Sequence, residues 1–359
     1  MRLWHRRLIN FIRKFDRTLY MVRGRYRRVI RREWRRPPWI DAYYGYGAPD
    51  FVRISGRVLR DKRITAKPSD TSYRNMINMI KRFDSDELKK AELEIRIGDN
   101  QFKVTTNSEG YYHLDAPLPQ AVQPNEEQYA RCTVELLSVP RFGPINLKTR
   151  SRIFMPPAEP AIGLISDVDD TLIQSHLTAP FKLKAIATTL FHNPSTRQTV
   201  EEAPEFYRFF ASHQTEQPRP IFYVSNSPWN LFDFLKEFLK LHKYPLGPLL
   251  LRDLGTPNQR IFTREPHHKT AVIRKILQTY PQLKFLLIGD SGERDPHIYS
   301  QIRAEFPGRI LGTYIREIKG GKWQKNDKQQ HIFSFRHFQE AQQQLQNEDW
   351  FLDFTQKGK

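Results

Sequence analysis

The stretch "GLISDVDDTLIQS", residues 163–175, gathers three aspartates directly behind a short apolar run. The run at 161–166 has the length and composition of a buried strand, so Asp167, Asp169 and Asp170 follow its carboxyl end. The chain carries a formal net charge of +19, which makes such a concentration of carboxylates unusual. In open α/β sheets, ligands bind beyond the carboxyl ends of the strands. The stretch therefore predicts a ligand site at this strand end.

The chain around this stretch alternates strand-like and helix-like segments. Further apolar runs are found at 220–225, 247–252, 284–290 and 309–315, and helical patterns are found at 199–212, 228–242, 268–280 and 295–306. Near-continuous apolar strands alternating with helices are typical of a parallel sheet covered on both faces. We expect an α/β domain over 160–318. Its cap is small or absent, since only the segment at 175–200 is available as a flap.

Residues 40–155 have a different pattern. Short alternating runs at 51–59, 91–98, 101–106, 110–116 and 131–139 are separated by turn signals, which favours a small β-sandwich with an insertion after its first strand. A proline-rich linker follows at 155–160. The Gln- and Lys-rich residues 319–359 are expected to form a helical C-terminal appendage.

Residues 1–38 form a third kind of segment. Residues 1–36 hold thirteen arginines and one lysine against two acidic residues, and apolar residues recur in steps of three and four. This pattern predicts a basic amphipathic helix that ends at Pro37 and Pro38. Such a helix can lie on an anionic membrane surface. Packing on the protein's own body and nucleic-acid binding are the alternatives; we expect the membrane and no nucleic acid.

The composition also bears on the compartment. No apolar run reaches the roughly 18 residues that a membrane-spanning helix needs, and Arg13 and Lys14 interrupt the stretch that would follow Arg6 and Arg7 in an export signal. Cys132 is the single cysteine, so no internal disulfide can form. We expect a cytoplasmic protein that associates peripherally with a membrane.

Polar residues are found at the ends of other predicted strands, as a site at this edge requires. Ser225 ends the run at 220–225, Lys269 lies near the start of a helix, and Asp290 ends the run at 284–290 with Asp295 shortly after it. These four pieces, in this order, resemble the four motifs of the haloacid-dehalogenase superfamily of aspartate-nucleophile phosphatases. The first motif, D-x-D-x-T, is residues 167–171 here.

Within residues 160–318, the sequence resembles one particular family of this superfamily. Four sequence segments resemble the Mg²⁺-dependent phosphatidate phosphatases of the actin-patch-protein type and their bacterial relatives. They are "DVDDTL", "YVSNSPWNLFDFLKEFL", "HKTAVIRKIL" and "LIGDSGERDPHIY". The resemblance implies a haloacid-dehalogenase-like Rossmannoid fold and Mg²⁺-dependent hydrolysis of a phosphomonoester. Phosphatidate, hydrolysed to diacylglycerol and phosphate, is the expected substrate.

The resemblance also implies roles for individual residues. Asp167 is the expected nucleophile, and Asp169 is the expected acid and base. Mg²⁺ is expected at Asp167, Asp290, Asp295 and the backbone carbonyl of Asp169. The expected phosphate-binding residues are Thr171, Ser225, Asn226 and Lys269.

Several neighbouring residues have simpler interpretations. Asp170 is expected to form a turn, and Asn226 and Ser227 can alternatively cap the helix that follows Pro228. His267 and His268 lack partners at metal-ligand spacing, so they are not expected to bind metal.

Other functions remain possible on this sequence. A phosphatase can act on phosphoproteins, nucleic-acid ends or soluble phosphate esters, and a protein with this fold can bind phosphate as a non-catalytic scaffold. The presence of Asp167, Asp169, Lys269 and Asp290 argues against the scaffold. The oligomeric state is not predicted.

Overall fold

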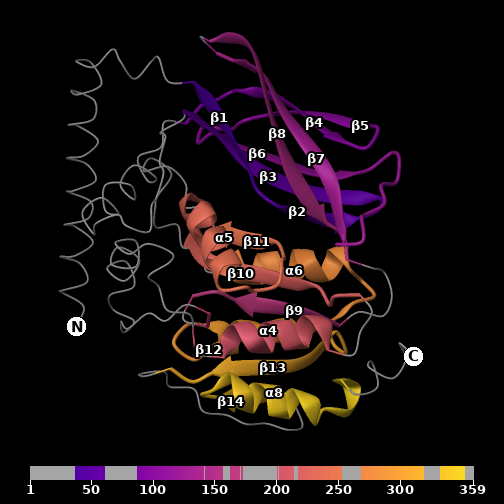
Figure 1. Ribbon diagram of the computed structural model, residues 1–359, viewed down its shortest axis with the longest axis vertical. Coiled ribbons are helices and arrows are strands. Elements are labelled where there is room, and N and C mark those ends of the chain that lie inside the picture. Colours follow the sequence, from indigo (N-terminus) through magenta and orange to yellow (C-terminus); the bar gives the residue numbers. More distant parts are fainter. Residues whose placement is uncertain are drawn as a thin grey trace, which may run out of the picture.

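The computed structural model describes residues 37–60, 87–140, 142–156, 162–169, 171–172, 200, 202–213, 217–252, 268–318 and 332–351. Several predicted features lie outside these residues: the basic amphipathic helix at 1–36, the insertion, the flap at 175–200, Asp170 and His267. Two sheets dominate the described part, a mostly antiparallel N-terminal one and a parallel C-terminal one (Figure 1).

The C-terminal sheet has six strands in the order β11-β10-β9-β12-β13-β14, and all neighbours are parallel. Their bounds are β9 Ile162–Asp167, β10 Ile221–Pro228, β11 Leu249–Arg252, β12 Lys284–Asp290, β13 Ile310–Arg316 and β14 Ile332–Phe335. β9 lies inside the sheet: the chain winds from it to β11 on one side and then returns to β12 on the other. The predicted parallel sheet is therefore confirmed, and Asp167 is the last residue of an interior strand.

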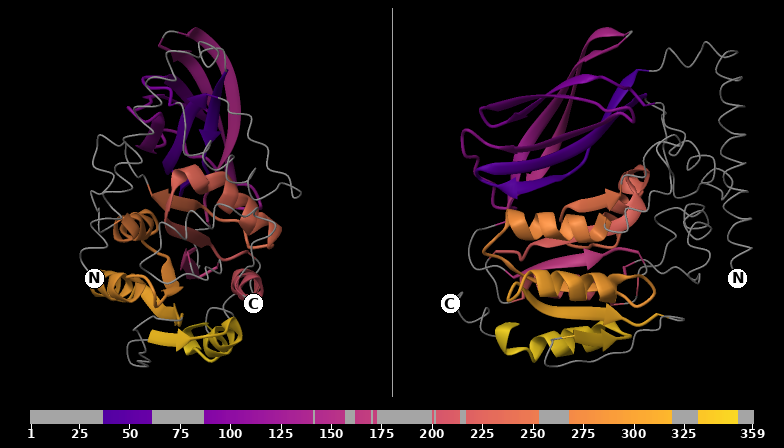
Figure 2. Two further views of the ribbon diagram at one scale, coloured as in Figure 1. Left: turned by 90° about the vertical axis from the view of Figure 1, so that its left-hand side faces the viewer. Right: turned by 180° about the vertical axis from the view of Figure 1, so that it is seen from behind.

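Helices cover both faces of this sheet because each strand buries side chains on both sides. α4 (Ala203–Ser212), α5 (Phe232–Leu241) and α8 (Phe338–Gln346) share one buried apolar cluster, which includes Leu164 of β9. α6 (His268–Thr279) and α7 (Asp295–Glu305) share another on the opposite face, which includes Ile165 (Figure 2). No helix in the described residues has both the length and the apolar character that crossing a membrane requires.

The C-terminal residues differ from the expected appendage. β14 pairs in parallel with β13, from Thr313 opposite Ile332 to Arg316 opposite Phe335. Phe335 and Phe338 are buried in the same cluster as α4. Without β14, the outer edge of β13 would present unpaired backbone N–H and C=O groups. Residues 332–346 therefore belong to the α/β domain, and its boundary at 318 is too early.

The N-terminal sheet has eight strands, with bounds β1 Pro38–Ala42, β2 Gly45–Ala48, β3 Phe51–Arg60, β4 Glu92–Ile97, β5 Asn100–Thr105, β6 Tyr111–Pro117, β7 Tyr129–Val139 and β8 Gly143–Phe154. The expected sandwich has two separate sheets. Here β2 pairs with both β3 and β8, so the strands join into one sheet. Side chains from both halves still meet in one core, for example Val52 and Leu114 with Leu93 and Val134.

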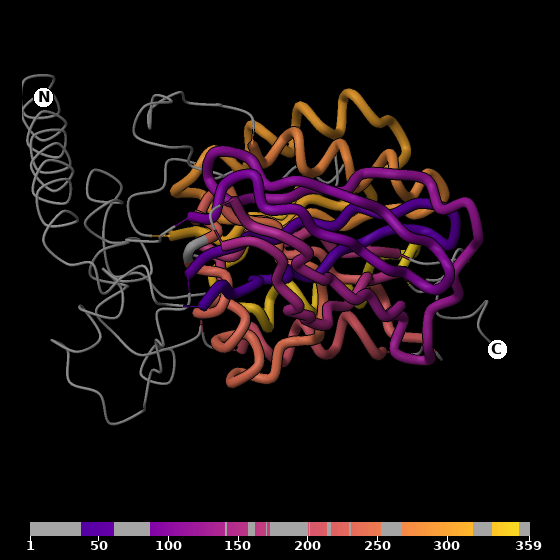
Figure 3. The backbone as a smooth tube through the Cα atoms, turned by 90° about the horizontal axis from the view of Figure 1, so that it is seen from above, coloured from indigo at the N-terminus to yellow at the C-terminus, as the bar shows by residue number. Residues whose placement is uncertain are grey.

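The N-terminal sheet packs against the α/β domain, and its strands lie over the α/β elements when the molecule is seen from above (Figure 3). The Tyr280 hydroxyl donates to the Gly47 carbonyl at 3.0 Å. The Gln128 amide donates to the Pro218 carbonyl at 2.7 Å. Aromatic rings pack across the same contact, including Tyr46 against Phe222. The N-terminal sheet is thus joined to the domain that carries the aspartates.

Candidate active site

The polar residues predicted at strand ends come together at the carboxyl edge of the parallel sheet. β9 ends at Asp167, β10 carries Ser225 near its end, and β12 ends at Asp290. The first turns of α6 and α7 bring Lys269 and Asp295 to the same edge. Parallel strands and the helices that follow them converge there, which is why residues more than 100 positions apart in sequence become neighbours.

Lys269 is the centre of the cluster. Its side chain is 2% exposed, and its Nζ lies 2.6 Å from Asp167 Oδ1, 2.7 Å from Asp295 Oδ1 and 3.0 Å from Glu293 Oε2. Burial alone would lower the pKa of Lys269, but the carboxylates of Asp167, Asp295 and Glu293 outweigh it and raise the pKa well above its usual value. Lys269 is therefore a buried ammonium ion that the surrounding carboxylates share.

Three buried carboxylates form a group with the composition of a metal site. One oxygen from each of Asp167, Asp290 and Asp295 lies within 4.8 Å of the others. Burial raises the pKa of Asp167 well above its ordinary value and also raises that of Asp295, although Lys269 opposes both shifts. Carboxylate oxygens are the ligands that Mg²⁺ prefers, and a further cation would offset the negative charge that Lys269 leaves unbalanced. These residues fit Mg²⁺.

Close packing holds this group in place. Asp290 Oδ1 accepts hydrogen bonds from the backbone N–H groups of Gly292 at 2.6 Å and Glu293 at 2.9 Å. At Gly289, an added Cβ would lie 2.4 Å from Asp295 Oδ2. Any larger residue at position 289 would push Asp295 away from Asp290.

Asp169 is held by two hydroxyl groups of β10. Ser225 Oγ donates to Asp169 Oδ2 at 2.6 Å, and Ser227 Oγ donates to Asp169 Oδ1 at 3.0 Å. The Ser227 backbone N–H donates in turn to Ser225 Oγ at 2.8 Å. Desolvation raises the pKa of Asp169, the nearby Glu293 charge adds to the rise, and the hydrogen bond from Ser225 opposes it. A raised pKa increases the fraction of this carboxyl group that is protonated at a given pH, which suits a group that donates and accepts a proton.

The other predicted phosphate-binding residues contact protein groups here. The Thr171 hydroxyl donates to Asp167 Oδ2 at 3.1 Å. The Asn226 side chain donates to Glu293 Oε2 at 3.0 Å. All eight predicted site residues thus lie in one network or beside it, at Asp167, Asp169, Thr171, Ser225, Asn226, Lys269, Asp290 and Asp295.

Two residues have contacts that the sequence did not predict. Glu293 Oε2 accepts from both Lys269 Nζ and Asn226 Nδ2, so it bridges two predicted phosphate-binding residues. Ser227 holds Asp169 and does not cap a helix; Pro228 precedes the short helix η4, Trp229–Leu231. Only their position in the sequence could have identified Glu293 and Ser227 as site residues, because both lie within three positions of a predicted site residue at a strand end.

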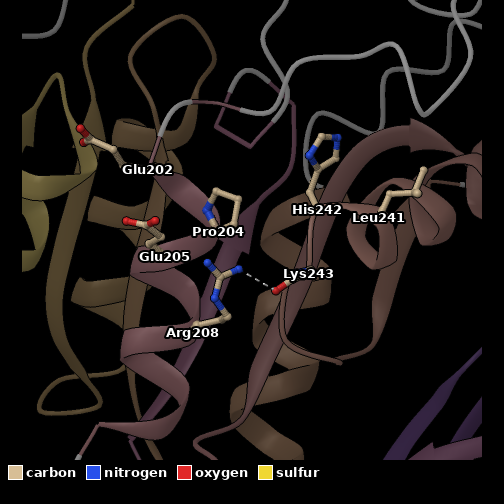
Figure 4. Close-up of a pocket in the computed structure, with 7 residues that line it drawn as sticks. All are labelled: Glu202, Pro204, Glu205, Arg208, Leu241, His242 and Lys243. Atoms are coloured by element: carbon tan, nitrogen blue, oxygen red, sulfur yellow. Dashed lines mark hydrogen bonds between the residues drawn. The ribbon is translucent and has the colours of Figure 1, made fainter.

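A pocket of about 510 Å³ lies elsewhere, between the start of α4 and the end of α5 (Figure 4). Arg208 reaches across it and donates to the Lys243 carbonyl at 3.1 Å. Glu202, Glu205 and Leu241 also line it, and none of the predicted site residues does. The candidate site is identified by the convergence of charged groups at the sheet edge.

Comparison with known proteins gives a similarity over the α/β part. Residues 162–317 match the model of the family described as "Phosphatidate phosphatase APP1, catalytic domain". The phosphatidate phosphatase APP1 of Saccharomyces cerevisiae is 34% identical over 156 residues, which are 43% of this chain and 26% of that protein. The protein C29B5.04c of Schizosaccharomyces pombe is 28% identical over 221 residues, 61% of this chain and 35% of that protein. The matched part spans about a third of these relatives or less.

Solved structures are far less similar. A carbohydrate acetylesterase from Xanthomonas citri is 11% identical, with 79% of this chain and 68% of that chain covered at a TM-score of 0.27. A β-glucuronidase from Parabacteroides merdae is 8% identical, with 79% and 35% covered at a TM-score of 0.26. Scores this low carry no conclusion about fold or activity. The similarity of residues 162–317 to phosphatidate phosphatase catalytic domains is the finding that bears on function.

Proposed function

We propose that this chain is a Mg²⁺-dependent phosphatase with a haloacid-dehalogenase-like catalytic domain, which hydrolyses a phosphomonoester through an aspartyl-phosphate intermediate. The observation that carries the proposal is the buried group of Asp167, Asp290 and Asp295 around Lys269 at the carboxyl edge of the sheet. Phosphoryl transfer needs an in-line nucleophile and positive charge at the phosphoryl oxygens, and this group offers both.

In the first step, an Asp167 carboxylate oxygen attacks phosphorus. A bond forms between that oxygen and phosphorus, the bond to the leaving oxygen breaks, and Asp169 gives its proton to the leaving alkoxide. Lys269 and the backbone N–H of Asn226 stabilise negative charge on the transferred phosphoryl group. The raised pKa of Asp169 supports its acid role, because a larger fraction of this carboxyl is protonated near neutral pH.

In the second step, water replaces Asp167 on phosphorus. Asp169 accepts a proton from the attacking water, the bond between Asp167 and phosphorus breaks, and inorganic phosphate leaves with Asp167 restored as a carboxylate. Mg²⁺ held by Asp167, Asp290, Asp295 and the Asp169 carbonyl would offset the repulsion between anionic substrate and carboxylates. Ser225 and Ser227 keep Asp169 oriented during both steps.

We propose phosphatidate as the substrate, with diacylglycerol and phosphate as products. The support is the match of residues 162–317, which include every proposed catalytic residue, to the family of phosphatidate phosphatase catalytic domains, together with the 34% identity to a yeast phosphatidate phosphatase over 156 residues. We further propose that residues 1–36, which lie outside the described part, bring this cytoplasmic enzyme to anionic membrane surfaces through their arginines.

The direct test measures phosphate release from phosphatidate in mixed micelles with Mg²⁺ and then with EDTA. Wild type should turn over only with Mg²⁺, and Asp167→Asn should be inactive in both. Full activity in EDTA or in Asp167→Asn would refute the mechanism. Turnover of water-soluble esters or phosphopeptides alone would keep the mechanism and refute the lipid substrate.

The membrane proposal has a separate test. Sedimentation with phosphatidylserine-containing liposomes should weaken when the arginines of residues 1–36 are replaced by glutamine in the full chain, while turnover of a soluble ester is retained. Unchanged sedimentation would refute the role of this segment.

A further inference from the structure

An aromatic residue of the N-terminal sheet contacts the segment beside the candidate site. The Tyr43 ring, from the chain between β1 and β2, stacks on the Trp229 ring with centroids 4.2 Å apart and an interplanar angle of 8°. It also contacts the Phe232 ring at 4.6 Å. Tyr43 is 3% exposed and belongs to the buried apolar cluster of the α/β domain. Tyr43 therefore crosses from one part of the chain into the core of the other.

The backbone of Tyr43 is fixed to its own sheet. Its N–H donates to the Ser55 carbonyl at 3.1 Å, and its carbonyl accepts from Ser151 Oγ at 2.7 Å. Ser55 lies on β3 and Ser151 on β8, so two strands hold this backbone. The ring is therefore an anchored part of the N-terminal sheet.

Trp229, on the other side of the stack, directly follows the end of β10. Two positions earlier, Ser227 Oγ donates to Asp169 Oδ1 at 3.0 Å. Three positions earlier, Asn226 Nδ2 donates to Glu293 Oε2 at 3.0 Å. Pro228 lies between and restrains the backbone, because its ring limits φ. The backbone that carries the Trp229 ring is therefore two residues from the hydroxyl group that contacts Asp169.

We propose that Tyr43 is a positioning residue: through its stack on Trp229, it holds the Ser225–Pro228 segment so that Ser227 keeps the Asp169 carboxyl oriented toward the leaving group. This inference rests on the proposed function. It gives the N-terminal sheet a role in turnover, although none of the residues that would contact the phosphate comes from that sheet.

The proposed role predicts a particular kinetic signature. A general acid matters most when the leaving group is a basic alkoxide and matters little when it is p-nitrophenolate, which leaves without a proton. A misoriented Asp169 therefore slows transfer of the phosphoryl group to Asp167 more for an alkyl phosphate than for p-nitrophenyl phosphate. A general loss of folded protein lowers both rates by the same factor, so the ratio separates the two causes.

The test compares kcat/KM for dioctanoyl phosphatidate and for p-nitrophenyl phosphate in the full chain, because kcat/KM reports formation of the aspartyl phosphate and not its hydrolysis, in which Asp169 serves both substrates alike. Tyr43→Leu removes the stack and should lower kcat/KM for the alkyl ester by about tenfold or more, since small displacements of catalytic groups can cost about a hundredfold. The kcat/KM for p-nitrophenyl phosphate should fall by less than about threefold. Tyr43→Phe keeps the ring and should restore the wild-type ratio.

Two further variants keep the test decisive. Trp229→Leu removes the other ring and should change the ratio in the same direction if Tyr43→Leu fails to fold. Tyr44→Leu is the matched control, because Tyr44 contacts Phe232 edge-on at 6.2 Å and is adjacent to Tyr43; it should leave the ratio unchanged. An unchanged ratio in folded Tyr43→Leu or Trp229→Leu would overturn this inference and leave the proposed function intact. A wild-type chain that hydrolyses neither ester would overturn the proposed function and the inference with it.

Discussion

Replacing Lys269 by methionine removes a buried cation and leaves its carboxylate partners in place. Methionine matches the length of the lysine stem, so the change mainly deletes the charge. In the structure the Lys269 ammonium lies within 3.0 Å of Asp167, Asp295 and Glu293. Removing one partner of a buried ion pair costs about 3 to 5 kcal/mol, because an uncompensated charge stays buried. For a domain of this size, that corresponds to a fall in Tm on the order of 10 °C.

The same substitution should also lower the rate of phosphate release. Loss of one preorganised group that stabilises transition-state charge costs about 10²- to 10³-fold in kcat. We would measure Tm in EDTA by circular dichroism and phosphate release with Mg²⁺. The matched control is Lys148→Met, since Lys148 pairs with Glu135 at 3.2 Å but its side chain is 49% exposed. The control should change stability by less than about 1 kcal/mol. A Tm for Lys269→Met equal to that of the control would refute the assignment of Lys269 as the charge that this cluster shares.

Three further predictions concern the same cluster. The raised pKa values of Asp167 and Asp295 mean that the folded, metal-free chain binds protons more tightly than the unfolded chain, so its Tm in EDTA should fall as pH rises from about 5 to 8. Mg²⁺ should reverse that trend; a metal-free Tm that rises over this range would contradict the shifts. Ser227→Ala should lower kcat for an alkyl ester by about tenfold through loss of a charge-assisted hydrogen bond to Asp169, and it should lower Tm by several degrees; an unchanged kcat would exclude that contact from the mechanism. Gly289→Ala should cost about 1 to 3 kcal/mol in thermal unfolding and weaken Mg²⁺ binding in calorimetry, because the new Cβ meets Asp295; unchanged Mg²⁺ affinity would speak against this packing.

The parallel sheet and the polar residues at its edge were predictable from local sequence. Strands buried on both faces leave continuous apolar runs, and the carboxyl ends of parallel strands meet at one edge, so the convergence of Asp167, Lys269 and Asp290 follows from topology. β14 was not predictable in this way. Its four residues are too short for a clear pattern, and its place is set by the free edge of β13.

The contacts of Glu293 and Ser227 depend on side-chain directions that spacing does not specify. In the turn after β12, the Glu293 backbone N–H donates to the Asp290 carboxylate, and the Glu293 side chain contacts Lys269. The stack of Tyr43 on Trp229 joins residues 186 positions apart, one between β1 and β2 and the other in η4, and no periodicity in the sequence marks it. Local patterns thus predict which groups share an edge, whereas long-range packing decides how they are held.

The most direct test of the central claim is to look for a phosphoryl group on Asp167 during turnover. Wild type with Mg²⁺ and a ³²P-labelled substrate would be quenched in acid within one turnover, digested, and analysed by mass spectrometry. The mechanism predicts labelled protein whose phosphoryl group lies on the peptide that contains Asp167, with none in Asp167→Asn or in EDTA. Release of labelled phosphate with no labelled protein at any quench time, or label on a different residue, would contradict the account.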